Sequence, residues 1–133
     1  MKNNRILLIE DDVNFRWVAQ SFFNILEYKT IIAKTGQEAF HLPSSNIALI
    51  LMTIWLPDMD ASKLCQHFRE VSAGKHIPII AVGAFPEDIK TDCLRFGFDD
   101  YLQKPTSLRL LTEMIEKWTR KNHNHSEYTF AIK

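Results

Sequence analysis

Short runs of apolar residues recur along the chain and predict buried strands. Residues 6–9 form an uninterrupted apolar run that ends at acidic residues, a pattern typical of a strand buried on both faces of a parallel sheet. Similar runs follow at 30–33, 47–52 and 77–82, and a shorter one lies at 101–102. We therefore expect five strands, with residues 47–52 as the central one.

Between these runs, apolar residues recur at the three-to-four-residue spacing of amphipathic helices. In the segment 13–27 they fall at Val13, Trp17, Val18, Phe22, Ile25 and Leu26. Further helices are expected at 36–42, 62–71, 86–96 and 107–120. Proline in a first helical turn and glycine just after a last turn support the limits of the segment 86–96.

Strands that alternate with helices predict an α/β fold. Five strand–helix units in this length indicate a flavodoxin-like, doubly wound (βα)5 three-layer sandwich whose parallel sheet has the order 2-1-3-4-5. In such a sheet the functional crevice lies at the carboxyl ends of the strands. We expect the domain to span residues 1–121, and residues 122–133 to be a flexible tail or the start of a linker.

Composition narrows the class of protein further. Lys+Arg and Asp+Glu both number 16, so net charge gives no argument for nucleic-acid or membrane binding and protects weakly against self-association. The sequence shows neither a signal peptide nor an apolar run of membrane-spanning length. Cys65 and Cys93 lie in no CxxC or metal-ligand pattern, which favours reduced thiols in a cytoplasmic protein over a disulfide.

Four segments at the strand ends together resemble the receiver domain of response regulators. Residues 6–12 resemble its first strand with the acids that follow, and 33–39 resemble the block after its second strand. Residues 56–60 resemble the loop after its third strand, and 97–105 its fifth-strand block. Each segment alone is weak evidence, but their order and spacing are specific.

The resemblance implies roles for particular residues. In the family, two acids after the first strand hold Mg²⁺, and an aspartate after the third strand becomes an acyl phosphate. A serine or threonine after the fourth strand binds the phosphoryl oxygen, a lysine after the fifth pairs with the charge, and an aromatic residue turns inward. Glu10 and Asp11 match the acidic pair, Lys104 matches the lysine, and Tyr101 matches the aromatic switch.

Two positions depart from the family pattern. Thr53 stands at the phosphoacceptor position, and Gly83 stands at the hydroxyl position. A threonine hydroxyl is neutral at physiological pH and needs a nearby base to act as a nucleophile. Thr53 also removes one anionic ligand, so Glu10 and Asp11 would bind Mg²⁺ only weakly, and no cofactor is required. Two losses on one pathway imply that phosphorylation has been abandoned.

The residues around these positions are expected to close the pocket. Trp55 follows Thr53 by two residues, and Phe85 follows Gly83 by two, so both should flank its mouth. Because Gly83 leaves free volume, we expect Trp55, Phe85 or Tyr101 to lean in and partly close the pocket.

The lysine after the fifth strand is expected to interact with the acids after the first strand, although a simpler role for these acids is also open. Lys104 lacks a carboxylate partner at the acceptor position, so we expect it to turn to Glu10 or Asp11 and neutralise the cluster. Alternatively, these acids only favour the start of the first helix, a role that Asp12 is expected to have as its N-cap.

Simpler interpretations also exist for other candidate residues. Thr53 can satisfy backbone groups at the end of its strand instead of being modified. Asp58 and Asp60 are candidates for a substitute acceptor, but they lie in a turn, where aspartate is expected for local hydrogen bonding. His123 and His125 form an isolated HxH pattern in the tail, which predicts no metal site.

These observations predict an atypical receiver that acts in two-component-type signal transduction by phosphorylation-independent protein–protein interaction, and that is not an enzyme. The expected partner is a protein: a sensor kinase, an output domain or another regulator. A homodimer through the face of segments 86–96, 101–102 and 107–120 is also expected, with no membrane or direct nucleic-acid binding. Two alternatives stay open: a functional phosphorelay receiver with a non-standard acceptor, and the regulatory N-terminal domain of a longer transcriptional or enzymatic regulator.

Overall fold

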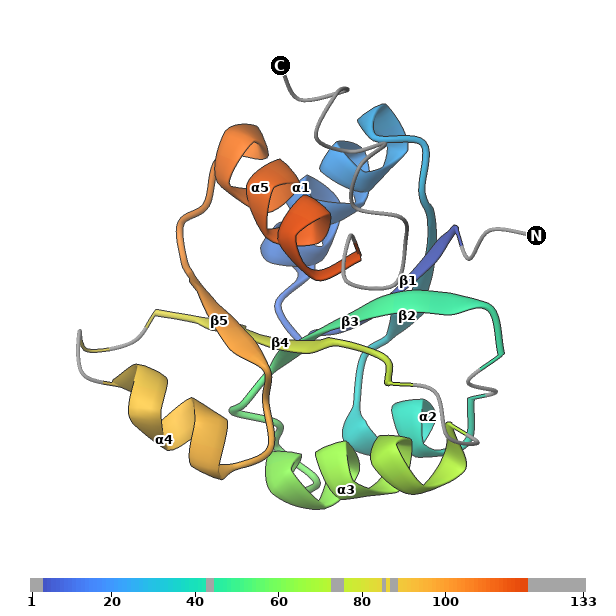
Figure 1. Ribbon diagram of the computed structural model, residues 1–133, viewed down its shortest axis with the longest axis vertical. Coiled ribbons are helices and arrows are strands. Elements are labelled where there is room, and N and C mark those ends of the chain that lie inside the picture. Colours follow the sequence, from blue (N-terminus) through green and yellow to red (C-terminus); the bar gives the residue numbers. More distant parts are fainter. Residues whose placement is uncertain (1–3, 43–44, 73–75, 85, 87–88, 120–133) are drawn as a thin grey trace.

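Strands and helices alternate along the chain in the predicted order (Figure 1). The computed structural model describes residues 4–42, 45–72, 76–84, 86 and 89–119. Its strands are β1 (Arg5–Ile9), β2 (Lys29–Ala33), β3 (Ile47–Thr53), β4 (Ile79–Gly83) and β5 (Asp100–Gln103). Its helices are α1 (Val13–Ile25), α2 (Gly36–Phe40), α3 (Ala61–Val71), α4 (Ile89–Arg95) and α5 (Leu108–Thr119).

The strands form one parallel sheet in the order β2-β1-β3-β4-β5, which confirms the predicted topology. Helices α1 and α5 cover one face of the sheet, and α2, α3 and α4 cover the other (Figure 1). All strands point the same way, so their carboxyl ends share one edge of the sheet.

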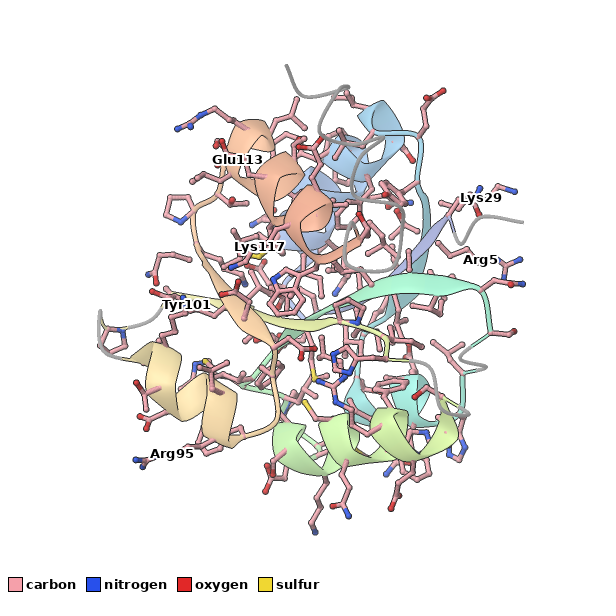
Figure 2. The ribbon with its side chains drawn as sticks, in the orientation of Figure 1. Arg5, Lys29, Arg95, Tyr101, Glu113 and Lys117 are labelled. Carbon is pink, nitrogen blue, oxygen red and sulfur yellow. The ribbon has the colours of Figure 1, made fainter. Side chains whose placement is uncertain are left out.

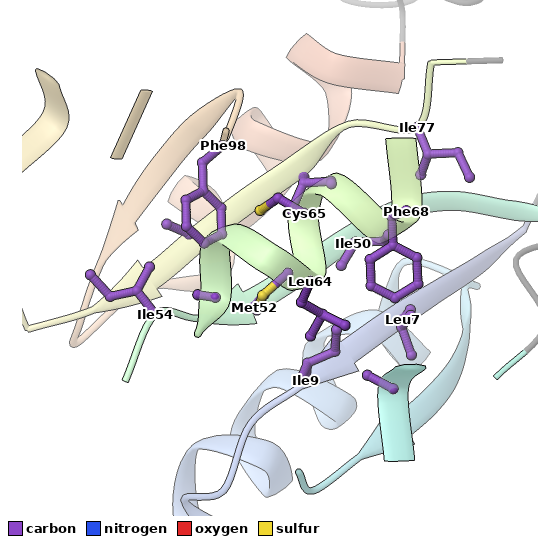
Figure 3. Close-up of a cluster of buried hydrophobic side chains, with 14 of the residues drawn as sticks. Leu7, Ile9, Ile50, Met52, Ile54, Leu64, Cys65, Phe68, Ile77 and Phe98 are labelled. Atoms are coloured by element: carbon purple, nitrogen blue, oxygen red, sulfur yellow. The ribbon is translucent and has the colours of Figure 1, made fainter. Parts of the chain in front are cut away.

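The central strands are apolar throughout because both of their faces are buried. In β1, Leu7 and Ile9 pack with the helices α2 and α3 (Figure 3), whereas Ile6 and Leu8 pack with α1 and α5. Full burial of each such side chain contributes roughly 1.5–3 kcal/mol to stability. The two hydrophobic layers therefore fix the register of β1, because a shift by one residue would exchange its two faces.

Gly97 ends α4, as the sequence predicted. Its φ of +108° lies in a region that favours glycine, and the N–H of Phe98 donates to the carbonyl of Cys93 at 3.1 Å. A Cβ at position 97 would lie 3.2 Å from the Cβ of Cys65 on α3. Gly97 therefore allows both the turn and the close approach of α3.

Several helix boundaries differ from the prediction by one to three residues. Helix α1 ends at Ile25 instead of residue 27, because Glu27 adopts a positive φ of 66°. Helix α4 begins at Ile89, and Pro86 lies one turn earlier, where its carbonyl accepts the N–H of Ile89 at 3.2 Å. The order of elements is unaffected by either difference.

The sequence analysis also made predictions about the cysteines, membrane-spanning segments and the C-terminal tail. Cys65 and Cys93 are buried free thiols, which excludes the disulfide alternative. Within the described ranges, no helix is both long and apolar enough to cross a membrane. Residues 120–133 lie outside the described part of the chain, and with them the predicted tail and its two histidines.

Candidate functional site

The sheet brings four of the predicted site residues to one edge. Glu10 directly follows β1, Thr53 ends β3, Gly83 ends β4 and Lys104 follows β5. The paired strands keep these ends level, since Ile9 lies opposite Met52, Thr53 opposite Val82 and Gly83 opposite Gln103. The backbone N–H of Lys104 also donates to the carbonyl of Gly83 at 2.8 Å.

Glu10 is a buried carboxylate with a lysine partner. Its side chain is 1% exposed, its Oε1 lies 2.8 Å from Lys104 Nζ, and its Oε2 accepts the N–H of Asp12 at 3.1 Å. Burial raises the pKa of Glu10 above its ordinary value, although Lys104 opposes this shift. The predicted turn of Lys104 towards the acidic cluster is therefore confirmed, with Glu10 as the partner.

Two residues of α1 complete this arrangement. Lys104 Nζ lies 4.5 Å from the centre of the Phe15 ring, a cation–π distance, and 4.0 Å from an oxygen of Asp12. Arg16 Nη1 donates to the backbone carbonyl of Glu10 at 3.0 Å. Sequence reasoning did not select Phe15 or Arg16, because no local pattern connects α1 with Lys104.

Thr53 is buried at the end of β3 and serves the local backbone. Its side chain is 4% exposed, and its Oγ1 accepts the N–H of Trp55 at 3.4 Å. This contact agrees with the alternative interpretation of Thr53 as a residue that satisfies backbone groups. Gly83, at the end of the neighbouring strand, is also buried and offers only backbone atoms to the pocket.

The predicted closure of the pocket is not seen at Trp55. Its side chain is 68% exposed, because Ile54 takes the buried position after Thr53 and packs into the core on the α3 side. Tyr101 is half-buried and packs against the same core. Phe85 lies outside the described residues.

Asp58 and Asp60 have structural partners away from the four strand ends. Asp58 accepts the backbone N–H groups of Gly36 and Gln37 at 2.9 and 3.0 Å, and these bonds lower the pKa of Asp58. The predicted local bonding is thus wrong for Asp58, which joins the loop after β3 to the start of α2. Asp60 does bond locally, since it accepts the N–H of Ser62 at 3.0 Å and caps α3.

The residues at the sheet edge fit Mg²⁺ poorly. Mg²⁺ requires near-octahedral oxygen ligands, and the Glu10 carboxylate is already engaged by Lys104. Asp12 caps α1 through Oδ1, and only Asp11 presents an exposed carboxylate without such a role. In the described part of the chain, no three His, Cys, Asp or Glu side chains are grouped to hold a metal ion.

A second candidate site is the face formed by α4, β5 and α5, which we call the α4–β5–α5 face (Figure 2). Buried Asp100 connects its elements by accepting from Lys117 Nζ at 2.9 Å and Trp118 Nε1 at 3.0 Å, with Lys90 Nζ at 3.8 Å. Burial alone would raise the pKa of Asp100, but the bonds from Lys117, Trp118 and the Tyr101 N–H outweigh it and lower that pKa.

Apolar side chains are exposed around this face. Leu94 and Phe96 at the end of α4 and Leu110 on α5 are each more than two-fifths exposed. Phe98, which lies between α4 and β5 in the sequence, is buried in the core, because the turn at Gly97 directs it under α3.

The fold agrees with the comparison with known proteins. The chain matches the response regulator receiver domain over residues 6–116. This protein therefore belongs to the response regulator receiver family.

Individual relatives agree with this assignment. The chain is 32% identical over 123 residues to the probable transcriptional regulator ycf27 of Cyanidium caldarium, covering 90% of this chain and 48% of that protein. The chain thus spans about half the length of that curated relative.

Solved structures give the same result. A two-component response regulator from Clostridium difficile is 28% identical with a TM-score of 0.80, covering 91% of this chain and 99% of that one. The receiver domain of sensor histidine kinase PA1611 from Pseudomonas aeruginosa PAO1 is 27% identical with a TM-score of 0.73. The match covers 87% of this chain and 97% of that one. That neighbour's structure has a magnesium ion coordinated in the active site cleft.

Proposed function

We propose that this protein is a pseudo-receiver, which signals in a two-component-type system by protein–protein interaction without being phosphorylated. The observation that carries the proposal is the set of strand-end residues: Thr53 where an acceptor carboxylate is needed, Gly83 where a hydroxyl is needed, and Lys104 held by Glu10. The protein acts as a signalling module in this proposal, and not as an enzyme.

The chemistry of Thr53 supports this proposal. Acyl-phosphate formation needs a carboxylate nucleophile, and the Thr53 hydroxyl would need a base to remove its proton. The hydrogen bond that Oγ1 accepts comes from the Trp55 N–H, which is a donor and cannot take a proton. The buried Glu10 carboxylate is held by Lys104 and the Asp12 N–H.

The neighbouring positions support a fixed conformation. Without a side chain at position 83, no hydroxyl can move towards a phosphoryl group and release space for Tyr101. Lys104 is also fixed by Glu10 and the ring of Phe15, so the buried charge of Glu10 is compensated without a bound ion. We infer that partners recognise one constant shape of the domain.

The proposed partner is a protein, such as a sensor kinase, an output domain or another regulator. The α4–β5–α5 face is the proposed surface for it or for a second copy of the chain, since Leu94, Phe96 and Leu110 are exposed there. We propose no direct membrane or nucleic-acid binding by this domain, and a cytoplasmic location stays a prediction. The division into a domain at 1–121 and a tail at 122–133 is also a proposal.

Intact mass after incubation with acetyl phosphate and Mg²⁺ tests the proposal. We expect no added phosphoryl group, whereas an authentic receiver domain treated in parallel should gain one. An added group that hydroxylamine removes would identify an acyl phosphate on Asp11, Asp58 or Asp60 and would establish a working phosphorelay receiver. A hydroxylamine-stable group would place a phosphate ester on Thr53 or another hydroxyl, which also contradicts the proposal.

A further inference from the structure

Helix α1 has an outer face without charge. Of its thirteen residues only Arg16 is charged, and that guanidinium is bonded to the Glu10 carbonyl. Each of the helices α3, α4 and α5 carries at least three charged residues. A helix that covers a sheet and faces water on its other side normally has charged residues on that side. The outer face of α1 therefore differs from the rest of the helical surface.

Large apolar side chains share this face with uncharged polar residues, among them the exposed Asn14 and Asn24. Trp17 is 74% exposed and Ile25 is 63% exposed, with Val13 and Val18 also exposed on the same helix. Depletion of charge together with exposed aromatic and aliphatic residues is the composition of a buried interface core. We call these four residues the α1 patch.

We propose that residues 128–132 of the same chain dock on the α1 patch and cover it. This segment alternates Tyr128, Phe130 and Ile132 with Thr129 and Ala131, and it contains no charged residue. In an extended conformation the three larger side chains would point to one side. An uncharged apolar segment thus meets an uncharged apolar face, so docking removes no charge from water.

The connection to α5 allows this contact. Helix α5 ends at Thr119 beside α1 (Figure 1), where Trp118 packs on the same hydrophobic cluster as Phe22 of α1 and Leu26, which follows that helix. Residues 120–127 separate this point from the segment and can span about 26 Å when extended. Helix α1 is about 20 Å long, so the segment can reach any part of the patch.

The dimensions of the two surfaces also agree. Residues 128 and 132 lie about 13 Å apart in an extended strand. Trp17 and Ile25 lie about 12 Å apart along the helix axis. Because the segment is tethered, its effective concentration at the patch is in the millimolar range, so a weak contact suffices. This inference does not depend on the phosphorylation state of the pocket.

Disulfide trapping in the full chain tests the docking. Asn24→Cys lies exposed on α1, and Ser126→Cys precedes the segment by two residues, on the side of its apolar anchors in an extended chain. Neither change removes an apolar anchor. Under mild oxidation we expect this pair to form an intramolecular disulfide about tenfold faster than the control pair Gln66→Cys and Ser126→Cys. Gln66 is exposed on α3, on the opposite face of the sheet. The native thiols are buried, and burial raises the pKa of Cys65 to about 12, so they should not compete.

A second variant separates docking from simple tethering. Changing Tyr128, Phe130 and Ile132 together to serine, in the Asn24→Cys and Ser126→Cys background, should slow trapping to the rate of the control pair. Equal rates for the two cysteine pairs, or no effect of the serine changes, would overturn the proposal. Disulfides only between chains would overturn it as well, since the patch would then bind a second copy.

Discussion

At the scale of single residues, Lys104 supplies the positive charge of the sheet edge. A carboxylate as buried as that of Glu10 is strongly disfavoured unless a counter-ion compensates it. In this chain the counter-ion is covalently part of the protein, and its ammonium group is further held over the Phe15 ring. The buried charge of Glu10 is therefore compensated by a side chain of the protein itself.

Replacing Lys104 by methionine should destabilise the protein in a pH-dependent way. Breaking a buried ion pair by removing one partner typically lowers the free energy of unfolding by about 3–5 kcal/mol. Burial already raises the pKa of Glu10, so the folded state holds this proton more tightly than the unfolded state. The stability contribution of Glu10 is thus greatest below its unfolded pKa and falls as pH rises through the folded one.

Removing Lys104 raises the pKa of Glu10 further. Lys104→Met should therefore lower the free energy of unfolding only slightly near pH 4 and strongly near pH 8. Urea denaturation at both pH values measures this difference. The matched control is Lys104→Met combined with Glu10→Gln, which removes the buried charge and should flatten the pH dependence. A loss that is the same at both pH values would show that Lys104 stabilises by packing alone.

Restoring a carboxylate at position 53 should create a metal site. In Thr53→Asp the new carboxylate lies at the edge shared with Glu10, which supplies the anionic oxygen that the natural chain lacks. We expect Mg²⁺ at about ten times its Kd to stabilise this variant by about 1.4 kcal/mol. The natural protein should respond much less.

Thermal denaturation with Mg²⁺, or with NaCl at the same ionic strength, measures this response. Thr53→Asn is the control, because it has similar size but no charge. Equal stabilisation of the natural protein and Thr53→Asp would mean that Glu10 and Asp11 already bind the ion.

At the scale of elements, side chains far apart in the sequence fix the loops that connect strands and helices. Arg69 of α3 donates to the carbonyls of Ile77 and Gly97 at 2.8 and 3.0 Å, and to Asp99 at 2.8 Å. It thereby joins α3 to the start of β4 and to the turn after α4. Asp58 similarly joins the loop after β3 to α2. The Arg69 contacts lie at the starts of β4 and β5, whereas the Asp58 contacts lie near the strand ends that carry the candidate site.

The turn after α4 gives a prediction at this scale. Gly97→Ala should lower the free energy of unfolding by about 1–3 kcal/mol, because an L-residue is strained at a φ of +108°. The added Cβ would also contact Cys65 closely. Gln66→Ala, an exposed change on α3, should alter stability by less than about 0.5 kcal/mol. Chemical denaturation of both variants checks this, and equal stabilities would contradict the role of Gly97.

At the scale of the whole molecule, two apolar surfaces lie on different sides of the fold. The α1 patch is proposed to bind the chain's own segment, which leaves the α4–β5–α5 face for association. Zero net charge offers little long-range repulsion between copies. The exposed leucines of α4 and α5 flank the face that Asp100 connects.

We therefore expect a concentration-dependent mass above 15.5 kDa in light scattering of the full chain. Leu94→Glu combined with Leu110→Glu should return the mass to that of a monomer, because like charges would face each other in the interface. Phe40→Glu on α2, which is also exposed, should leave association unchanged. A monomer at every concentration would remove the homodimer from the proposal.

Sequence reasoning succeeded where one physical signal dominated. Short apolar runs marked every strand, and the family segments placed Glu10, Thr53, Gly83 and Lys104 at strand ends. It was less accurate where contacts between distant segments decide which partner a side chain has. Asp58 is an example, because its hydrogen-bond partners lie 21 and 22 residues away. Trp55 also could not be placed, because its direction depends on Ile54 entering the core.

The sequence by itself thus determined the family, the parallel sheet and the absence of a carboxylate at position 53. These follow from periodicity and from residue identity, which need no coordinates. Only the tertiary structure decided that Lys104 pairs with Glu10 over Phe15, that Phe98 is buried, and that the outer face of α1 is apolar and exposed. Those outcomes depend on how separate elements pack together, and packing geometry is not encoded in any single local pattern.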